Sequence, residues 1–182
     1  MIDYLVLDFE SDDTRSCNKT VNPLDPMSSI RLIQYKLPNQ DAEVIDIGVR
    51  DLNYDSRVKA ALITLLGDTR LLIGHNIKYD LSFLWKYNWF QKWLQDGGKV
   101  FDTAQAEYLL SGQSKIYPDL NYCSEKYGGT QKDDWIKPLF KAGKTSTDII
   151  NMSPEHQKRF VEYARDDVIN TEIVYLAQMK RV

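Results

Sequence analysis

The feature that most constrains the fold of this chain is a short apolar run that ends in two acidic residues. The run Ile2–Phe9 is rich in residues that favour β-strands and is too short for a helix, which is typical of a buried strand. Asp8 and Glu10 stand at its end and share one face of the strand. Two carboxylates held this close repel each other unless a cation lies between them. The pattern predicts a central strand that carries part of a metal site, with a solvated strand end as the simpler alternative.

Two further blocks have helical spacing. Asn76 and Asp80 are four residues apart, as are Tyr163 and Asp167, so each pair lies on one helical face. In the second block, the simpler alternative is that Asn76 caps a helix and that Asp80 is a solvated acid. In the third block, an exposed charged helix with a half-buried tyrosine would give the same pattern. Spacing also leaves Asp166, one position earlier, open as a rival to Asp167.

The length and composition are those of one globular domain over residues 1–182. Hydrophobic residues make up 43% of the 182 residues and charged residues 27%. Cys17 and Cys123 are the only cysteines, and their separation indicates neither a disulfide framework nor a zinc site, so a cytoplasmic location is expected. No apolar run approaches the ~20 residues that span a bilayer, and no signal peptide is recognised, so no membrane partner is expected.

The net charge of −3 argues mildly against a nucleic-acid partner, because proteins that bind nucleic acids are often basic. However, four carboxylates that hold two divalent cations are about neutral together. The acidity is therefore partly explained by the proposed site.

Three expected strands precede alternating helices and strands. The strands Ile30–Leu37 and Ala42–Ile47 follow Ile2–Phe9 as an antiparallel meander. Segments 12–27 and 128–152 are expected to be irregular. This order predicts an α/β fold in which a mixed sheet, an antiparallel meander plus parallel strands, is flanked by helices. The other expected elements are a strand over Leu71–Ile73 and helices over Tyr54–Leu66, Ile77–Tyr87, Asp102 to about Leu110, Leu120–Tyr127 and Ser153 to about Met179.

The three blocks together resemble the DnaQ-like (DEDD) 3′→5′ exonucleases, in the subgroup with a tyrosine in the last motif. The resemblance extends from residue 4 to about residue 176 and implies a ribonuclease H-like fold. Within this group, the chain is most similar to the proofreading domain of family A DNA polymerases, including free-standing phage versions. The matching motifs are Asp8-x-Glu10, Asn76-x-x-x-Asp80 and Tyr163-x-x-x-Asp167 followed by Val168, with His75 before Asn76 and the segment Phe101-Asp102-Thr103.

The resemblance implies a catalytic role for each matched residue. Asp8, Glu10 and Asp167 would bind the metal that carries the attacking water. Asp8 would bridge to a second metal, which Asp80 would help to hold, largely through water. Tyr163 would orient the water through its hydroxyl group. Hard oxygen ligands suit magnesium or manganese, so the expected cofactors are two divalent ions, Mg²⁺ or Mn²⁺, that clamp an in-line displacement.

The implied substrate is the 3′ end of single-stranded DNA, cut to nucleoside 5′-monophosphates. A DNA polymerase encoded elsewhere is the expected partner, since no polymerase module fits in 182 residues. Phe9, Ser11 and Asn76 are the expected substrate contacts. Ser11 stands where the family usually has threonine, and the stretch 12–15 lacks the apolar residue with which family A enzymes separate terminal bases. Candidates for stacking on bases, with core or loop packing as the alternative, are Tyr117, Tyr122, Trp135 and Phe140.

Two other functions stay open. No residue in the motifs reads a 2′-hydroxyl, so an RNA 3′ exonuclease similar to RNase D fits them equally well. A non-catalytic module that partners a polymerase would keep the same fold. Such a module would be expected to have lost at least one of the proposed catalytic residues. All five are intact: Asp8, Glu10, Asp80, Tyr163 and Asp167.

Overall fold

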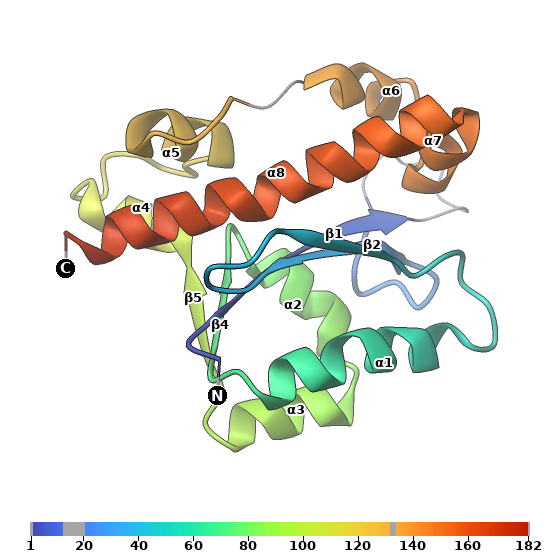
Figure 1. Cartoon of the computed structure of the whole chain (residues 1–182), viewed down its shortest axis with the longest axis horizontal. Helices are drawn as coiled ribbons and strands as arrows, with labels where there is room; N and C mark the ends of the chain where they lie inside the picture. Colours follow the sequence, from blue (N-terminus) through green and yellow to red (C-terminus); the bar gives the residue numbers. More distant parts are fainter. Residues whose placement is uncertain (1, 13–20, 132–133, 182) are drawn as a thin grey trace.

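The computed structural model describes residues 2–12, 21–131 and 134–181. Within these residues, a five-stranded sheet lies between two groups of helices (Figure 1). The strands follow one another across the sheet in the order β3-β2-β1-β4-β5. They are β1 (Leu5–Asp12), β2 (Ser29–Lys36), β3 (Glu43–Asp46), β4 (Leu71–Gly74) and β5 (Lys99–Asp102).

The central strand, β1, joins the two halves of the sheet. It is antiparallel to β2, which is antiparallel to β3, and it is parallel to β4, which is parallel to β5. The expected α/β fold with a mixed sheet is therefore confirmed. The carboxyl ends of β1, β4 and β5 lie at one edge of the sheet, which is where open α/β sheets bind their ligands.

Helices cover both faces of the sheet. The longest helix, α8, crosses one face, and α1 and α3 cover the opposite face (Figure 1). None of the described helices is long and apolar enough to cross a membrane. The helices are α1 (Tyr54–Gly67), α2 (Lys78–Leu84), α3 (Asn88–Gln95), α4 (Thr103–Leu110), α5 (Leu120–Tyr127), η1 (Asp134–Ile136, a 3₁₀ turn), α6 (Lys137–Lys141), α7 (Ser146–Met152) and α8 (Pro154–Met179).

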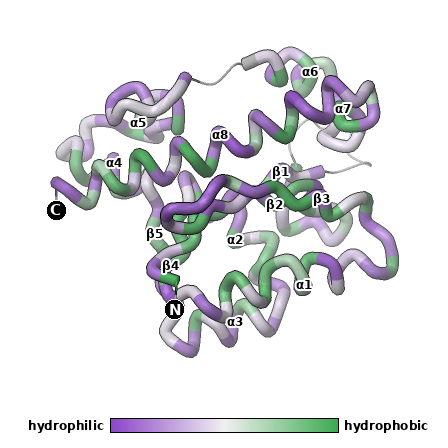
Figure 2. Tube along the Cα trace, in the orientation of Figure 1, coloured by the Kyte–Doolittle hydropathy of each residue, from purple (hydrophilic) through white to green (hydrophobic). Residues whose placement is uncertain are grey.

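The side chains of β1 divide between the two faces. The residues that enter the larger core, shared with α1 and α3, are Leu5, Leu7 and Phe9. Val6 points to the other face, where it packs in one cluster with Val168 of α8. Because side chains alternate along a strand, Asp8 and Glu10 lie on the same face as Val6 and point toward α8. In Figure 2, apolar and polar stretches alternate along α8, as expected for a helix with one face on the sheet.

The expected start of α8 is confirmed, but the expectation for the segment before it is wrong. Ser153 caps α8 by accepting a hydrogen bond from the His156 N–H. Residues 128–152 are not irregular throughout, since they contain α6 and α7. A reciprocal capping box between Thr145 and Asp148 begins α7.

The expectation for residues 77–87 is also partly wrong. The first helix, α2, ends at Leu84, and a separate helix, α3, begins at Asn88. Asn76 does not cap α2: its φ is 54° and the helix begins at Lys78 without a side-chain cap. Of the expected loop 12–27, Asp12 belongs to β1 and residues 13–20 lie outside the described residues.

Candidate active site

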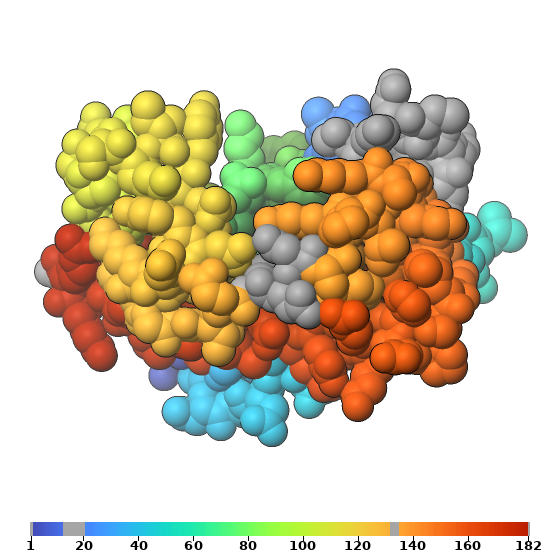
Figure 3. Space-filling model, turned by 90° about the horizontal axis from the view of Figure 1, so that it is seen from above, coloured from blue at the N-terminus to red at the C-terminus, as the bar shows by residue number. Residues whose placement is uncertain are grey.

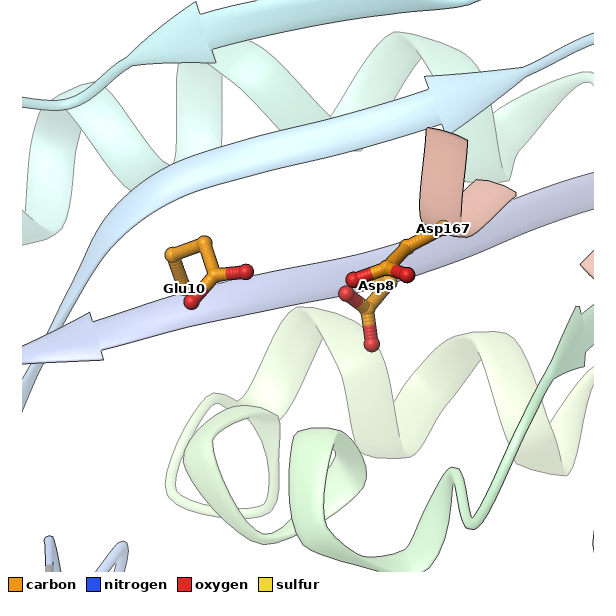
Figure 4. Close-up of side chains that lie close together, drawn as sticks. All are labelled: Asp8, Glu10 and Asp167. Carbon is orange, nitrogen blue, oxygen red and sulfur yellow. The ribbon is translucent and has the colours of Figure 1, made fainter. Parts of the chain in front are cut away.

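Three carboxylates from distant parts of the sequence meet on one face of β1. Asp8 and Glu10 come from β1, and Asp167 comes from α8 (Figure 4). Each offers one carboxylate oxygen, and these oxygens all lie within 4.8 Å of one another. Like charges this close are stabilised by a cation between them, and oxygen ligands of this kind suit Mg²⁺ and Mn²⁺. The donor set therefore fits a divalent metal.

The packing of α8 on the sheet turns the side chain of Asp167, and not that of its neighbour Asp166, toward the carboxylates of β1. Ala164 and Val168 are fully buried, which fixes the rotation of the helix about its axis. At this rotation Asp167 is 5% exposed and joins the cluster, whereas Asp166 is exposed to solvent. The structure thus places Asp167, and not Asp166, beside the two acids of β1.

Asp80 is held next to this cluster by the backbone of β1. Its Oδ1 accepts a hydrogen bond of 3.0 Å from the N–H of Phe9, the residue between the two strand acids. Burial, and then the negative charge of Asp8, raise the pKa of Asp80 well above its usual range. A divalent cation nearby would oppose the effect of the Asp8 charge and favour the ionised form of Asp80.

Gln34 of β2 is a residue of the site that the motifs do not include. It stands opposite Asp8 in the register of the two strands and is fully buried. Its Nε2 donates a hydrogen bond to Asp8 Oδ2. Gln34 lies between Ile33 and Tyr35 in the expected strand Ile30–Leu37, and its pairing with Asp8 depends on the strand register, which the sequence does not show.

The three expected substrate contacts lie in different environments. The side chain of Phe9 packs in the core and is 5% exposed, so it is the backbone of Phe9 that borders the carboxylates. Ser11 follows the bulge after Glu10, and its Oγ is 2.8 Å from the Tyr79 hydroxyl. Asn76 is exposed at the start of the α2 segment. The stretch 12–15 lacks an apolar residue that could separate terminal bases, and its residues 13–15 lie outside the described residues.

Tyr163 lies one helical turn before Asp167 on α8. The residue is half-buried, and its ring centroid is 6.4 Å from that of Phe160. It packs beside the cluster that contains Ile136 and Ile149. The side chain therefore combines core packing with a position one turn from the carboxylates.

Two pockets adjoin the region between α2 and β5. The larger, of about 810 Å³, lies between the segment that precedes α2, the start of α4 and the connection from α4 to α5. The smaller, of about 420 Å³, lies between α2 and β5. Both are lined by Lys78, Asp102 and Gln105, so they are neighbours on one surface.

Comparison with known proteins identifies the fold. No protein-family model and no curated protein sequence matches the chain. It is similar to the RNase D of Trypanosoma brucei, with a TM-score of 0.69 and 17% identity over 97% of this chain and 57% of that one. The chain has a ribonuclease H-like fold.

Two further structures share this fold. A family B DNA polymerase from the hyperthermophilic archaeon Pyrobaculum calidifontis matches with a TM-score of 0.64 and 17% identity, over 98% of this chain and 25% of the polymerase. A nuclease in its apo form matches with a TM-score of 0.62 and 15% identity, over 98% of this chain and 72% of the nuclease. The chain therefore spans a quarter of the polymerase and just over half of the RNase D that it matches.

Proposed function

We propose that this chain is a metal-dependent 3′→5′ exonuclease that cuts single-stranded DNA ends to nucleoside 5′-monophosphates. The observation that carries the proposal is the meeting of Asp8, Glu10 and Asp167, with Asp80 bonded to the backbone between the two strand acids. Phosphodiester hydrolysis by two metals needs such a set of hard oxygen ligands at one place. The shared fold with an RNase D, a nuclease and a DNA polymerase supports this class of chemistry.

In the proposed mechanism the carboxylates would hold two divalent ions, Mg²⁺ or Mn²⁺, which would supply an activated water and neutralise developing charge. Asp8, Glu10 and Asp167 would hold one ion, and Asp8 and Asp80 would hold the other, with Asp80 acting largely through water. Tyr163 would orient the nucleophilic water through its hydroxyl group.

The biological role that we propose is proofreading for a separately encoded DNA polymerase in the cytoplasm, by a single domain over residues 1–182. The match to the polymerase from Pyrobaculum calidifontis supports an association with a DNA polymerase, because in that protein the same fold is one part, 25%, of a polymerase chain. The motif Tyr163-x-x-x-Asp167 supports the tyrosine subgroup as part of this proposal.

A second candidate function is an RNA 3′ exonuclease. The match to RNase D, which covers 97% of this chain with a TM-score of 0.69, favours it as strongly as the polymerase match favours DNA. The two candidates share the carboxylate chemistry and differ in the sugar of the substrate. A substrate comparison therefore decides between them.

The proposal is tested by digesting 5′-labelled single-stranded DNA and RNA of the same sequence in the presence of magnesium. We expect a ladder of 3′-shortened DNA. Asp167→Asn should lower the rate by at least ~100-fold, because loss of a direct ligand costs no less than loss of an outer partner. The matched variant Asp166→Asn, at an exposed neighbour, should stay close to the wild-type rate.

Each other outcome has a defined meaning. A ladder on RNA alone would establish the second candidate. Absence of a ladder on both substrates would refute the exonuclease and leave a non-catalytic module. Equal losses in the two variants would refute the assignment of Asp167 as the ligand.

A further inference from the structure

The pocket of about 810 Å³ has no role in the proposed chemistry, although it adjoins α2. Its volume lies in the range of ~300–1,000 Å³ that is usual for small-molecule sites, which is sufficient for a nucleotide. In Figure 3, the yellow segments that contain α4 and α5 border a hollow with the green of α2 behind it. One wall of the pocket is largely apolar and is formed by Tyr108, Ile116, Tyr117 and Pro118.

Tyr117 combines a costly backbone conformation with an exposed ring. Its φ of 52° lies in the left-handed region, which bulky residues rarely adopt. The residue is nevertheless 92% exposed, so burial of its ring does not offset this cost. Strained residues that the core does not require are concentrated at binding sites. Stability alone therefore gives no account of an aromatic side chain here.

Hydrogen bonds from His75 fix the wall of the pocket. The Nδ1 of His75 is 2.9 Å from Thr103 Oγ1 at the start of α4. Its Nε2 is 3.0 Å from the carbonyl oxygen of Pro118, the residue after Tyr117. These bonds tie the connection between α4 and α5 to the end of β4. A preformed wall lowers the entropy that a ligand must lose on binding.

Lys78 gives the pocket one cationic group that can contact a phosphate, beside two carboxylates. Asp102 accepts a hydrogen bond of 2.9 Å from the backbone N–H of Asn76. Asp119 accepts one of 2.8 Å from the N–H of Tyr122. Both carboxylates are thus engaged with the backbone, whereas Lys78 forms no ion pair within the part of the chain that the structure describes. Its ammonium group is available to a phosphate.

The helix α2 connects this pocket to the carboxylate cluster. Lys78 lines the pocket, and Asp80, two residues later, bonds to β1. Residues at i and i+2 of a helix point to different sides, so α2 presents one group to each site. A strand whose 3′ end lies at the carboxylates can pass the start of α2 and enter the pocket.

We propose that this pocket binds the bases beyond the first nucleotide upstream of the scissile bond of a single-stranded nucleic acid, with Tyr117 as the stacking platform. Stacking on an aromatic ring tolerates every base, which suits an enzyme that removes successive nucleotides. The phosphate between two such bases lies next to Lys78. The proposal rests on the proposed function, because the carboxylates set the position of the strand.

The test uses Tyr117→Asn, because asparagine tolerates the left-handed backbone but offers no ring. Tyr117→Phe is the conservative variant, and Leu52→Ala is the control, since Leu52 is fully exposed and lines neither pocket. The KM and kcat are measured on a dinucleotide and on a longer oligonucleotide of the same base. Binding of the fluorescent oligonucleotide is measured by anisotropy, and stability by thermal unfolding.

We expect Tyr117→Asn to raise the KM for the longer substrate about tenfold without changing kcat, which is the effect of losing one stacked base. The dinucleotide, which does not reach the pocket, should be cleaved as by the wild type. Tyr117→Phe should behave as the wild type, and the thermal midpoint of Tyr117→Asn should not fall. Equal effects on both substrates, or none, would overturn the proposal, as would a loss of affinity that follows a loss of stability.

The anisotropy measurement keeps this result separate from the proposed function. If the wild type cleaves neither DNA nor RNA, the exonuclease proposal fails. Weaker oligonucleotide binding by Tyr117→Asn alone would then still support the pocket as a nucleic-acid site. Binding that is unchanged in this variant would overturn the pocket as well.

Discussion

Asp8 is the residue on which the proposed site depends most. Its carboxylate belongs to the cluster with Glu10 and Asp167, and its charge contributes to the raised pKa of Asp80. Gln34 holds it from the neighbouring strand through the bond to Oδ2. A hydrogen bond to one carboxylate oxygen orients the other, and partners of this kind increase the affinity of a ligand set for its metal.

We therefore expect Gln34→Leu to weaken the apparent magnesium affinity of cleavage by ~10–100-fold. The free energy of unfolding should fall by no more than ~3 kcal/mol, because the variant loses a hydrogen bond to a charged carboxylate but also removes a buried Oε1 that has no hydrogen-bond partner among the described residues. A magnesium titration of the cleavage rate and urea unfolding measure the two effects. Gln40→Leu, at an exposed position, is the control. An unchanged magnesium dependence would show that Gln34 does not position Asp8.

At the scale of the elements, a buried carboxylate joins α4, α5 and α8. The side chain of Glu107 on α4 is fully buried, and its Oε1 lies 2.6 Å from the Lys126 ammonium of α5. Its Oε2 accepts hydrogen bonds from Tyr127 and from Gln178 of α8. Burial alone would raise the pKa of Glu107, but these hydrogen bonds outweigh burial and lower it. The ionised form is thus the one that stabilises this group of helices.

Glu107→Gln should lower the free energy of unfolding by about 2 kcal/mol at neutral pH. Because the pKa of Glu107 is lower in the folded chain, its stabilisation is complete above the unfolded value of ~4.3 and is lost as the pH falls through the folded value. The stability difference between wild type and variant should therefore shrink in acid. Urea unfolding at neutral and acidic pH measures it, with exposed Glu125→Gln as the control. A difference that stays constant with pH would contradict the account.

Elements with strong local signals could be predicted from the sequence, and those set by packing could not. The apolar run of β1 and the Ser-Pro start of α8 are local signals. The start of α7 is less apparent, because its capping box uses Asp148 where glutamate or glutamine is usual. The break between α2 and α3 depends on the extended backbone of Tyr87 and on the burial of Phe90 and Trp93, which helical periodicity does not show.

At the scale of the whole molecule, the order of the strands brings the candidate site together. The parallel strands β4 and β5 end level with the middle of β1, so Asn76 and Asp102 lie at these strand ends and Asp8 lies in β1 just beyond its pairing with β4. The motifs could predict which acids are candidates. They could not predict Gln34, because its position opposite Asp8 depends on the strand register, or the pocket wall at Tyr117, which depends on how the connection after α4 folds back.

The central claim is that the acids of β1 and α8 bind the divalent metals of a hydrolytic site. Its most direct test is a titration with Mn²⁺, in which electron paramagnetic resonance counts the bound ions in the wild type and in Asp8→Ala. The account predicts two ions for each wild-type chain and a loss of both sites in Asp8→Ala, because Asp8 is shared between them. A wild type that binds no Mn²⁺, or an Asp8→Ala variant that binds as many ions with the same affinity, would contradict it.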